Sequence, residues 1–497
     1  MKKTILLLTL LTILYLLGFS LAFSYLFEAV TPGKFLDLVR NFIEYSIMFV
    51  SLIIFCSVML KNKFTSVITY VFLVLATLNF GLSIGAALIY KSDVNIGMIL
   101  SIMDTNINEA VSMSTMFILP SVIALIMLAL SIYCAITIKN TIRLNWKTAV
   151  ISSLWILMPF IFFMKHKYIS NKGGGKMIKN VFYLSNYIDQ SLQIRKESEE
   201  ISAVQPSFDV QKVDEGVQNI VLIIGESARK QNFSLYGYPK KTTPYEDAEK
   251  KNMLLFENAV SPAGITNLSV PLVLSTVEPG EFQTHFNKIS DNIINLSNHI
   301  GYKTSWISMQ GAARGITSIA NMATYKKWLN GYDEVSISHL KEIFNPKSKN
   351  LIVIHLNGSH PNPCDRIPPE EKSDKLNYYD QSIQYTDKLL GQVFKFSKKN
   401  NTVVIYFSDH GVKIKGNKFL HTDSKESTQV PFFIWYSDDI ADKYREIGTV
   451  NQVTQTTKIF PLISRFMGLK EPEKYKDERL KYLKLDLSVI PYSELKE

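Results

Sequence analysis

Asn219-Ile-Val-Leu-Ile-Ile-Gly-Glu-Ser-Ala-Arg229 is the stretch of this sequence that decides the fold. It joins a short, continuous Val/Ile/Leu run (219–224) to a group of small and polar residues. Such a run, bounded by polar residues, is typical of a strand that is buried on both faces of a sheet. The pattern is repeated at 304–307, 351–355, 402–407 and 431–435.

Helix-like stretches, including 290–299 and 378–394, separate these segments. The alternation of short apolar strands with helices predicts an α/β domain with a mainly parallel central sheet. In such sheets ligands bind beyond the carboxyl ends of the strands. The residues that directly follow each strand are therefore the candidates for a functional site.

Carboxylates and imidazoles recur at these strand ends. Glu, Asp and His together are the ligand types for a zinc-like divalent ion, which activates a nucleophile and polarises a phosphoryl oxygen. An Asp-His pair is often structural, and a carboxylate after a strand often caps a helix. Recurrence at successive strand ends nevertheless favours a metal site. The residues are Glu226, His355, His360, Asp409 and His410, with His421 after a short basic loop.

A nucleophile for such a site is expected in the small, polar segment 261–271, which we interpret as a loop that opens into a helix. Backbone N–H groups at that helix N-terminus would hold phosphate oxygens, and metal coordination would lower the pKa of a hydroxyl. Thr266 and Ser269 are both candidates on this chemistry. Ordinary helix capping is the alternative for either residue.

The whole chain divides into two unlike parts. Residues 1–165 carry 11 Lys/Arg and 6 Asp/Glu, whereas residues 166–497 carry 43 and 38. The mean hydropathy of only +0.07 is therefore an average over an apolar part and a charged part. This composition excludes a disordered protein, a small disulfide scaffold and a collagen-like fibre. The net charge of +10 is spread along the chain without a nucleic-acid-binding motif, so no nucleic-acid partner is expected.

Five apolar runs in the first part are each near the roughly 20 residues that cross a bilayer. Any single run could be a core helix, but five in succession predict a transmembrane domain. The first run is too long for a cleaved signal and is expected to be retained. The runs are 4–27, 41–60, 64–90, 116–137 and 148–165.

The short loops predict that the N-terminus is cytoplasmic. With that orientation the charged residues of the inner loops are all basic, whereas the outer loops 28–40 and 91–115 together hold five acids and three bases. An odd number of spans then places everything after residue 165 on the far side. The basic stretch 165–176 argues weakly for the opposite, but long domains translocate regardless of charge. Cys56 and Cys134 fall near cytoplasmic ends and Cys364 lies outside, so no intrachain disulfide is expected.

Residues 172–206 are predicted to connect the two parts. After a glycine break at 173–175, apolar residues recur at helical spacing among polar ones. This pattern predicts an amphipathic helix that lies along the membrane surface or packs on the soluble domain. The expected organisation is a transmembrane domain (1–165), a bridging region (166–212) and a catalytic domain (213–497). The apolar positions of the helix are Ile178, Val181, Phe182, Ile188 and Leu192.

The order of these motifs resembles that of the bacterial phosphoethanolamine transferases. These are inner-membrane enzymes of the alkaline phosphatase/sulfatase-like superfamily, and they include enzymes that modify lipid A. The resemblance spans essentially the whole chain and implies an alkaline-phosphatase-like catalytic domain. The matching segments are Gly-Glu-Ser-Ala-Arg (225–229), Asn-Phe-Ser-Leu-Tyr-Gly-Tyr (232–238), Thr-Thr-Pro (242–244), Thr-x-x-Ser-Val-Pro (266–271), Gly-Ser-His-Pro (358–361), Ser-Asp-His-Gly (408–411) and His421.

The resemblance implies one tightly bound zinc ion, held by Glu226, Asp409 and His410. Thr266 would be the fourth ligand and also the nucleophile that becomes modified with phosphoethanolamine.

Four further residues match family positions that bind the donor. His360 and His421 match histidines that hold the donor phosphate or a second zinc. Thr105 and Glu109 align with positions that contact the phosphoethanolamine head group. A solvated loop acid is the alternative for Glu109.

The implied reaction moves phosphoethanolamine from phosphatidylethanolamine to an anionic envelope glycolipid, either lipid A or the lipopolysaccharide core. It would pass through a phospho-threonine and release diacylglycerol. The implied location is the inner membrane of a Gram-negative cell, with the catalytic domain in the periplasm. The alternatives are a phosphoglycerol transferase and a phosphodiesterase or sulfatase-type hydrolase of the same superfamily. A non-enzymatic scaffold is disfavoured because the residue set is intact.

The sequence also departs from the family pattern. Ser101 stands where lipid A-modifying members commonly have Asn, Val412 where Glu is usual, and Thr422 where Gly is usual. Many of those members carry disulfides in the outer domain, which this chain cannot form. These departures leave the residues of the core chemistry in place, but they weaken the inference that the acceptor is the same as in those members.

Overall fold

The computed structural model describes residues 6, 50–90, 94–105, 107–141, 145–148, 150–154, 176–208, 210–311, 314–360, 362–416, 418–470 and 480–497. The chain forms two compact units. One comprises residues 1–95 and 111–190, and the other comprises residues 96–110 and 191–497. The short segment 96–110 therefore belongs to the same unit as the C-terminal domain, although it lies within the apolar third of the sequence.

Two helices among the described residues are long and apolar enough to cross a membrane, namely Lys63–Tyr90 and Ser114–Thr141. The first consists of α4 (Lys63–Gly85) and a π-helical extension (Ala86–Tyr90). The second lies within α6 (Ile107–Thr141). A shorter apolar helix covers Val50–Met59.

These helices overlap the predicted spans 64–90 and 116–137 and part of the span 41–60. The predicted span 4–27 and most of 148–165 lie outside the described residues. The total of five spans therefore stays a prediction.

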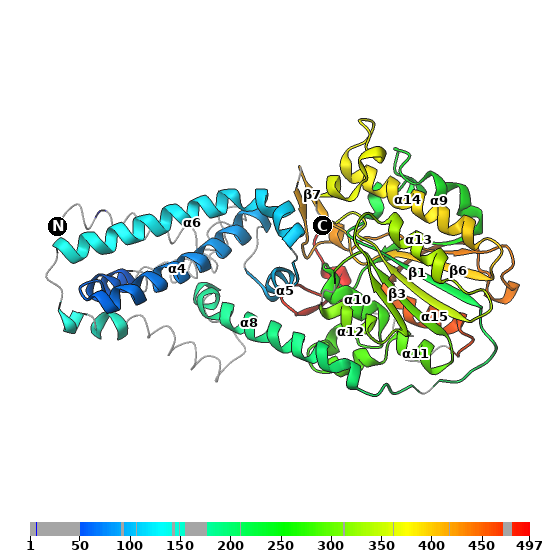
Figure 1. Ribbon diagram of the computed structural model, residues 1–497, viewed down its shortest axis with the longest axis horizontal. Helices are drawn as coiled ribbons and strands as arrows, with labels where there is room; N and C mark the ends of the chain where they lie inside the picture. Colours follow the sequence, from blue (N-terminus) through cyan, green and yellow to red (C-terminus); the bar gives the residue numbers. More distant parts are fainter. Residues whose placement is uncertain are drawn as a thin grey trace. The chain divides into compact units, whose positions relative to one another are not determined.

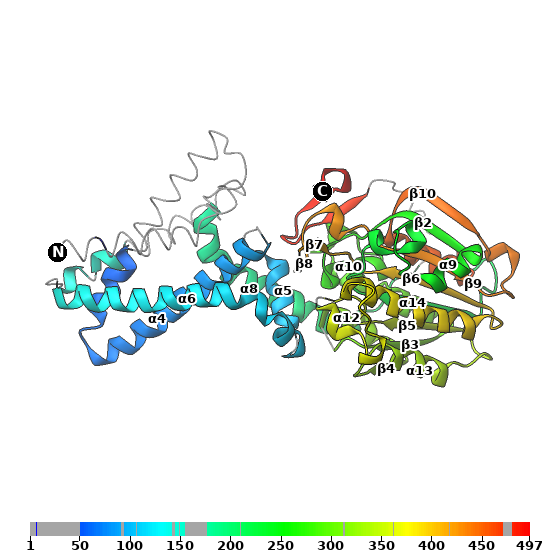
Figure 2. The same ribbon diagram turned by 90° about the horizontal axis from the view of Figure 1, so that it is seen from above.

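The second unit is built on an eight-stranded sheet with the order β10-β2-β9-β6-β1-β5-β3-β4 (Figures 1 and 2). At its centre β1 (Asn219–Gly225) pairs in parallel with β5 (Asn350–His355) and β6 (Thr402–Ser408). The sheet continues through β3 (Lys303–Ser308) to β4 (Tyr325–Trp328), both parallel to their neighbours.

On the other side of β6 the direction changes. Strand β9 (Phe432–Tyr436) is antiparallel to both β6 and β2 (Met253–Val260). Strand β10 (Gly448–Gln455) pairs in parallel with β2 and forms the edge. The sheet is therefore mainly parallel, as predicted, with β9 as its reversed strand.

The five strands expected from the sequence are β1, β3, β5, β6 and β9, with ends that differ by no more than one residue. The strands β2, β4 and β10 were not predicted. Strands β4 and β10 are edge strands with mostly exposed or half-exposed side chains, so they lack the continuous apolar run of a buried strand.

Helices cover both faces of the sheet, which explains why its central strands are apolar throughout (Figure 1). One face carries α9 (Pro244–Glu249), α13 (Glu334–Ile343) and α14 (Tyr378–Ser397). The other face carries α10 (Thr266–Leu274), α11 (Ile293–His299), α12 (Arg314–Ala320) and α15 (Ile459–Phe466). The predicted helices 290–299 and 378–394 correspond to α11 and α14.

Alternate strand residues form the core under α13 and α14. Val221 and Ile223 of β1 pack in one buried cluster with Ile383 and Leu390 of α14. The two antiparallel hairpins β7–β8 (Lys413–Lys415 and Lys418–Leu420) and β11–β12 (Lys481–Leu483 and Val489–Pro491) lie outside the main sheet.

Helix α5 (Ile96–Asp104) joins this unit through a hydrogen bond from Gly97 N to Leu485 O of 2.8 Å. The predicted connector helix is α8 (Lys176–Glu200), whose last turns belong to the same unit. Ser191 and Ser198 in these turns are buried, whereas Leu192 is 48% exposed. The buried face of these turns therefore carries serines as well as Ile194, and the predicted apolar position Leu192 does not lie on it.

Candidate active site

The parallel pairing of β1 and β6 brings two predicted ligands together. Gly225 and Ser408 are register partners at the carboxyl ends of these strands, so Glu226 and Asp409 leave the sheet side by side. Glu226 is 1% exposed, and Asp409 and His410 are fully buried. Buried charged groups of this kind need compensating partners.

The turn after β1 is held in an uncommon conformation. Ser227 has a φ of 56°, its N–H donates to Asp409 Oδ1 (3.2 Å), and its hydroxyl donates to Glu226 Oε1 (2.6 Å). Tyr379 Oη donates to Ser227 O at 2.7 Å. Gly358 has a φ of +52°, and a Cβ there would lie 2.8 Å from Glu226 N. The loop after β5 thus fits against Glu226 only because residue 358 has no side chain.

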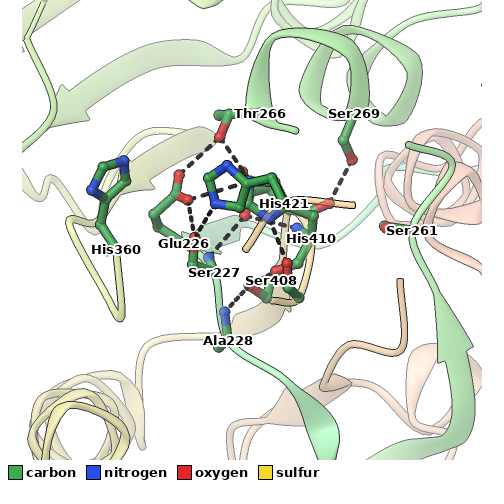
Figure 3. A network of polar contacts seen from close by, with 12 residues as sticks. Glu226, Ser227, Ala228, Ser261, Thr266, Ser269, His360, Ser408, His410 and His421 are labelled. Carbon is green, nitrogen blue, oxygen red and sulfur yellow. Dashed lines mark hydrogen bonds and ion pairs between the residues drawn. The ribbon is translucent and has the colours of Figure 1, made fainter. Parts of the chain in front are cut away.

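The hydroxyl of Thr266 lies in the same cluster (Figure 3). Thr266 is the first residue of α10, and its Oγ1 is 3.0 Å from Glu226 Oε2 and 3.1 Å from His410 Nε2. Ser269 uses its hydroxyl differently, because Oγ donates to the backbone carbonyl of Asp409 at 2.5 Å. Of the two hydroxyls that the sequence left open, Thr266 therefore faces the carboxylate and imidazole groups.

The orientation of His410 fixes its proton. Its Nδ1 lies 2.9 Å from the carbonyl oxygen of Gly411, which only accepts, so Nδ1 carries the hydrogen. The lone pair of Nε2 then points to the cluster, 3.4 Å from Glu226 Oε1 and 3.3 Å from Asp409 Oδ2. This is the arrangement of a histidine that binds a metal through Nε2.

The donor set fits a divalent metal. Asp409 Oδ2 is buried and has no hydrogen-bond partner, which is costly for a carboxylate unless a cation faces it. Ligands of a tetrahedral zinc at about 2.0–2.1 Å lie about 3.3 Å from one another. Four contacts in this group are close to that spacing. Thr266 Oγ1 lies 3.0 Å from Glu226 Oε2 and 3.1 Å from His410 Nε2, and His410 Nε2 lies 3.4 Å from Glu226 Oε1 and 3.3 Å from Asp409 Oδ2.

Two further histidines lie around this group. Among the described residues, Glu226, His410 and His421 offer ligand atoms that all lie within 4.8 Å of one another. The ring centroids of His421 and His410 are 4.7 Å apart. His360 stands on the Glu226 side in Figure 3, and Arg366 donates to its Nδ1 at 3.2 Å. The Nε2 of His360 therefore carries the hydrogen and can donate to a phosphate oxygen.

The two carboxylates have opposite pKa shifts. Burial alone would raise the pKa of Glu226, but the charges of His410 and His360 hold it below the ordinary value. Burial and then the charge of Glu226 raise the pKa of Asp409 to about 7. Without a cation, a proton therefore binds to Asp409 in preference to Glu226, and a bound divalent ion would favour the ionised form of Asp409.

The two histidines next to them also differ. Burial lowers the pKa of His410, but the carboxylates of Asp409 and Glu226 outweigh it and raise the value. Burial and the charge of His410 lower the pKa of His421 to about 3, so His421 is neutral at physiological pH.

Gln310 is a site residue that the sequence reasoning missed. Its Nε2 donates to Glu226 Oε2 and to Leu356 O, both at 2.9 Å. Gln310 follows β3 at the same sheet edge, so the rule that selected Glu226 and Asp409 could also have selected it. Arg366 carries no such signal, because it ends a short 3-10 helix (Pro363–Arg366) and does not directly follow a strand.

Of the two residues predicted to contact the donor head group, Thr105 and Glu109, only Thr105 has a described side chain. Thr105 follows α5 and its hydroxyl donates to Ser101 O at 2.6 Å. The side chain of Glu109 lies outside the described residues. A role for Thr105 and Glu109 at the donor head group therefore stays a prediction.

The Sulfatase family model matches residues 218–469, which include every predicted ligand. The chain belongs to the sulfatase family. Among its relatives in this family, the Escherichia coli (strain K12) protein named "Putative transferase YhbX" is 33% identical over 431 residues, covering 81% of this chain and 79% of YhbX. Phosphoethanolamine transferase OpgE of the same strain is 28% identical over 416 residues, or 76% of each chain.

Solved structures extend the likeness to the fold. The integral membrane protein lipooligosaccharide phosphoethanolamine transferase A (EptA) from Neisseria meningitidis matches with a TM-score of 0.66 at 18% identity, covering 99% of both chains. The C-terminal periplasmic domain of EptC from Escherichia coli, in complex with Zn, matches with a TM-score of 0.51 at 21% identity. That match covers 59% of this chain and 97% of the domain.

The predicted resemblance is thereby confirmed. This sulfatase-family chain has phosphoethanolamine transferases among its homologues and shares the alkaline-phosphatase-like fold with them. It is a member of a transferase family, and its buried donor set accommodates a metal.

Proposed function

We propose that this protein transfers phosphoethanolamine from phosphatidylethanolamine to an envelope glycolipid through a phosphoethanolamine-modified Thr266. The observation that carries the proposal is the position of the Thr266 hydroxyl. It lies 3.0 Å from Glu226 and 3.1 Å from His410, beside the unpartnered Oδ2 of Asp409. The homologues named phosphoethanolamine transferases support this choice of group.

Glu226, Asp409, His410 and Thr266 are the residues that would hold a zinc ion. Bound there, the ion would lower the pKa of the Thr266 hydroxyl and polarise a phosphoryl oxygen. A second zinc near His360 and His421 is an alternative to direct phosphate binding by these two histidines.

In the first step Thr266 Oγ1 attacks the phosphorus of the donor. Glu226 Oε2, 3.0 Å away, is placed to accept the hydroxyl proton. The new O–P bond forms as the bond from phosphorus to the glycerol oxygen breaks. That oxygen takes a proton from solvent and diacylglycerol leaves, while the Nε2–H of His360 can donate a hydrogen bond to a phosphate oxygen.

In the second step a hydroxyl or phosphate of the acceptor attacks the phosphothreonine. The proton of an attacking hydroxyl passes to solvent, and the proton held by Glu226 returns to Thr266 as the Oγ1–P bond breaks. The two steps regenerate the enzyme without an external reductant or oxidant. Thr266 begins α10, and the N-terminus of a helix favours a negatively charged phosphate group.

The membrane part fits this chemistry, because both substrates are lipids. Confining the catalytic domain to the leaflet raises the effective concentration of donor and acceptor. We therefore place the protein in the inner membrane of a Gram-negative cell, with its catalytic unit in the periplasm and an anionic glycolipid as acceptor.

The test compares glycolipid masses from cells that express the wild type, Thr266→Ala or Ser269→Ala. We expect a phosphoethanolamine increment with the wild type and with Ser269→Ala, and none with Thr266→Ala. Persistence of the increment in Thr266→Ala would contradict the proposal. A phosphoglycerol increment would instead identify a phosphoglycerol transferase, and release of free phosphoethanolamine without an increment would identify a hydrolase.

A further inference from the structure

The hairpin formed by β11 (Lys481–Leu483) and β12 (Val489–Pro491), which we call the C-terminal hairpin, contacts three segments that carry predicted site residues. Residues 484–488 connect its two strands. The three segments are the loop before the nucleophile, the segment after His421, and α5, which Thr105 directly follows. All of them belong to the second unit.

The first contact is with the loop that leads to the nucleophile. Leu483 N donates to Pro262 O at 2.9 Å. A Cβ on Gly264 would lie 2.9 Å from the hydroxyl oxygen of Tyr482 and 3.0 Å from Thr422 O. The hairpin therefore packs against this loop at a point where only glycine leaves enough room.

The second contact is made by Asp423, two residues after His421. Its Oδ1 accepts one hydrogen bond from Tyr482 Oη and one from Leu485 N, both at 3.0 Å. Tyr482 and Leu485 are buried, so removing this acceptor would leave a buried hydroxyl and a buried N–H without it, which is costly. Asp423 thus joins the His421 segment to the C-terminal hairpin.

The third contact is with α5, and Leu485 makes it as well. The carbonyl oxygen of Leu485 accepts a hydrogen bond from Gly97 N at 2.8 Å. A Cβ on Gly97 would lie 3.0 Å from this oxygen and 3.1 Å from Leu485 Cβ, so the helix approaches the hairpin as closely as glycine permits. Leu485 therefore links Asp423, through its N–H, to α5, through its carbonyl group.

Apolar packing also holds α5. Leu100 and Met103 of α5 line a small pocket beside α10, together with Leu268 of α10 and with Ser191 and Ser198 of α8. The hydrophobic effect is non-directional, whereas a hydrogen bond requires a narrow range of distance and angle. The contact with Leu485 therefore determines the position of α5 more closely than this packing does.

We propose that Asp423 is a positioning residue, which acts through Leu485 to hold α5, and with it Thr105, at a fixed place relative to His421. Thr105 is predicted to contact the head group of the donor, and His421 is predicted to hold its phosphate. A shift of α5 therefore weakens donor binding and leaves the zinc ligands in place. This effect on the donor rests on the proposed function, whereas the effect on α5 does not.

The first test measures hydrogen exchange of the amides in residues 96–104, using the full chain in detergent micelles. Exchange should be about fivefold faster in Asp423→Ala than in the wild type, the effect of losing one hydrogen bond. Asp423→Asn keeps the Oδ1 acceptor without the charge and should exchange like the wild type. Equal exchange in Asp423→Ala and wild type, or equally fast exchange in both variants, would overturn the proposal.

Gly97→Ala separates the position of α5 from its stability. Alanine is a better helix former than glycine, so the helix itself gains stability, but the added methyl group pushes Leu485 away. We therefore expect weaker donor binding in spite of a more stable helix. Gly280→Ala is the matched control, because nothing lies within 4 Å of a Cβ at this exposed position. Donor binding as tight in Gly97→Ala as in the control would contradict the proposal.

Donor binding is measured from the rate at which phosphatidylethanolamine, labelled in its ethanolamine, labels the protein at increasing donor concentration. The half-saturating concentration should rise about fivefold in Asp423→Ala and Gly97→Ala, with the maximal rate and the zinc content unchanged. Asp423→Asn should match the wild type. An unchanged half-saturating concentration in Asp423→Ala would retain the proposed function and refute the positioning role. Faster exchange of α5 in Asp423→Ala, in a protein that the donor does not label, would retain the role of Asp423 at α5 and refute the proposed function.

Discussion

The metal cluster and the pocket beside α10 both contain buried polar atoms without partners, but the surroundings of these atoms differ. Asp409 Oδ2 is charged when ionised and faces the imidazole of His410 at 3.3 Å. Ser191 Oγ and Ser198 Oγ are neutral and lie within an apolar wall. A cation would satisfy the carboxylate, whereas a neutral hydrogen-bond acceptor such as water would satisfy the two hydroxyls. A buried polar atom without a hydrogen-bond partner does not by itself identify a ligand. The charge and polarity of the neighbouring groups decide which ligand would fit.

Asp409→Asn should have the largest effect on the metal cluster and leave the pocket beside α10 unchanged. Removing one anionic ligand while keeping its shape should weaken zinc binding by more than about a hundredfold and abolish transfer. Zinc content is measured by elemental analysis of the purified chain, with Ser198→Leu as the reciprocal control that keeps its zinc. Equal zinc in Asp409→Asn and wild type would refute the assignment of this ligand.

Gly358→Ala should act on the cluster through the backbone. The φ of +52° and the 2.8 Å approach to Glu226 N leave no room for a methyl group, so we expect a loss of about 2 kcal/mol in stability and weaker zinc binding. Gly237→Ala is the control, because its φ is +90° but nothing lies within 4 Å of its Cβ. Thermal unfolding should show a smaller loss in Gly237→Ala and normal zinc content. A similar zinc content in both variants would show that the contact with Glu226 does not matter.

Glu246→Met tests a buried carboxylate with no imidazole beside it. Both carboxylate oxygens of Glu246 lack partners, and burial and then the charges of Asp387 and Asp247 raise its pKa well above the usual value. The folded state therefore keeps a proton that the unfolded chain loses, and stability falls as the pH rises above about 4.5. Zinc content and transfer should be unchanged, because this site has no metal-binding partner.

The variant's advantage in Tm over the wild type should be greater at pH 8 than at pH 5. An advantage of the same size at both pH values would show that Glu246 does not keep its proton in the folded state.

The candidate site at the carboxyl ends of the strands could be predicted from the sequence, because ligands bind at this edge of a parallel sheet. Parallel strands such as β1 and β6 place the residues after them side by side, so Glu226 and Asp409 could be paired before their contacts were known. Resemblance to a known family then selected Thr266 over Ser269, and the structure places the Thr266 hydroxyl within the cluster.

The pocket could not be predicted in this way. Its walls come from α5, α8 and α10, which are separated by long stretches of chain, and serines in a helix resemble ordinary surface residues. Edge strands β4 and β10 were missed for a related reason, since their exposed side chains lack a buried pattern. Such features depend on which segments meet, and local sequence does not encode that.

The central claim is that Thr266 carries the phosphoethanolamine group during transfer. The most direct measurement incubates the purified full chain with phosphatidylethanolamine labelled in its ethanolamine, without acceptor, and maps the label by peptide mass spectrometry. We expect label on Thr266 in the wild type and none in Thr266→Ala or Asp409→Asn. Label on another residue, or undiminished transfer by Thr266→Ala, would contradict it.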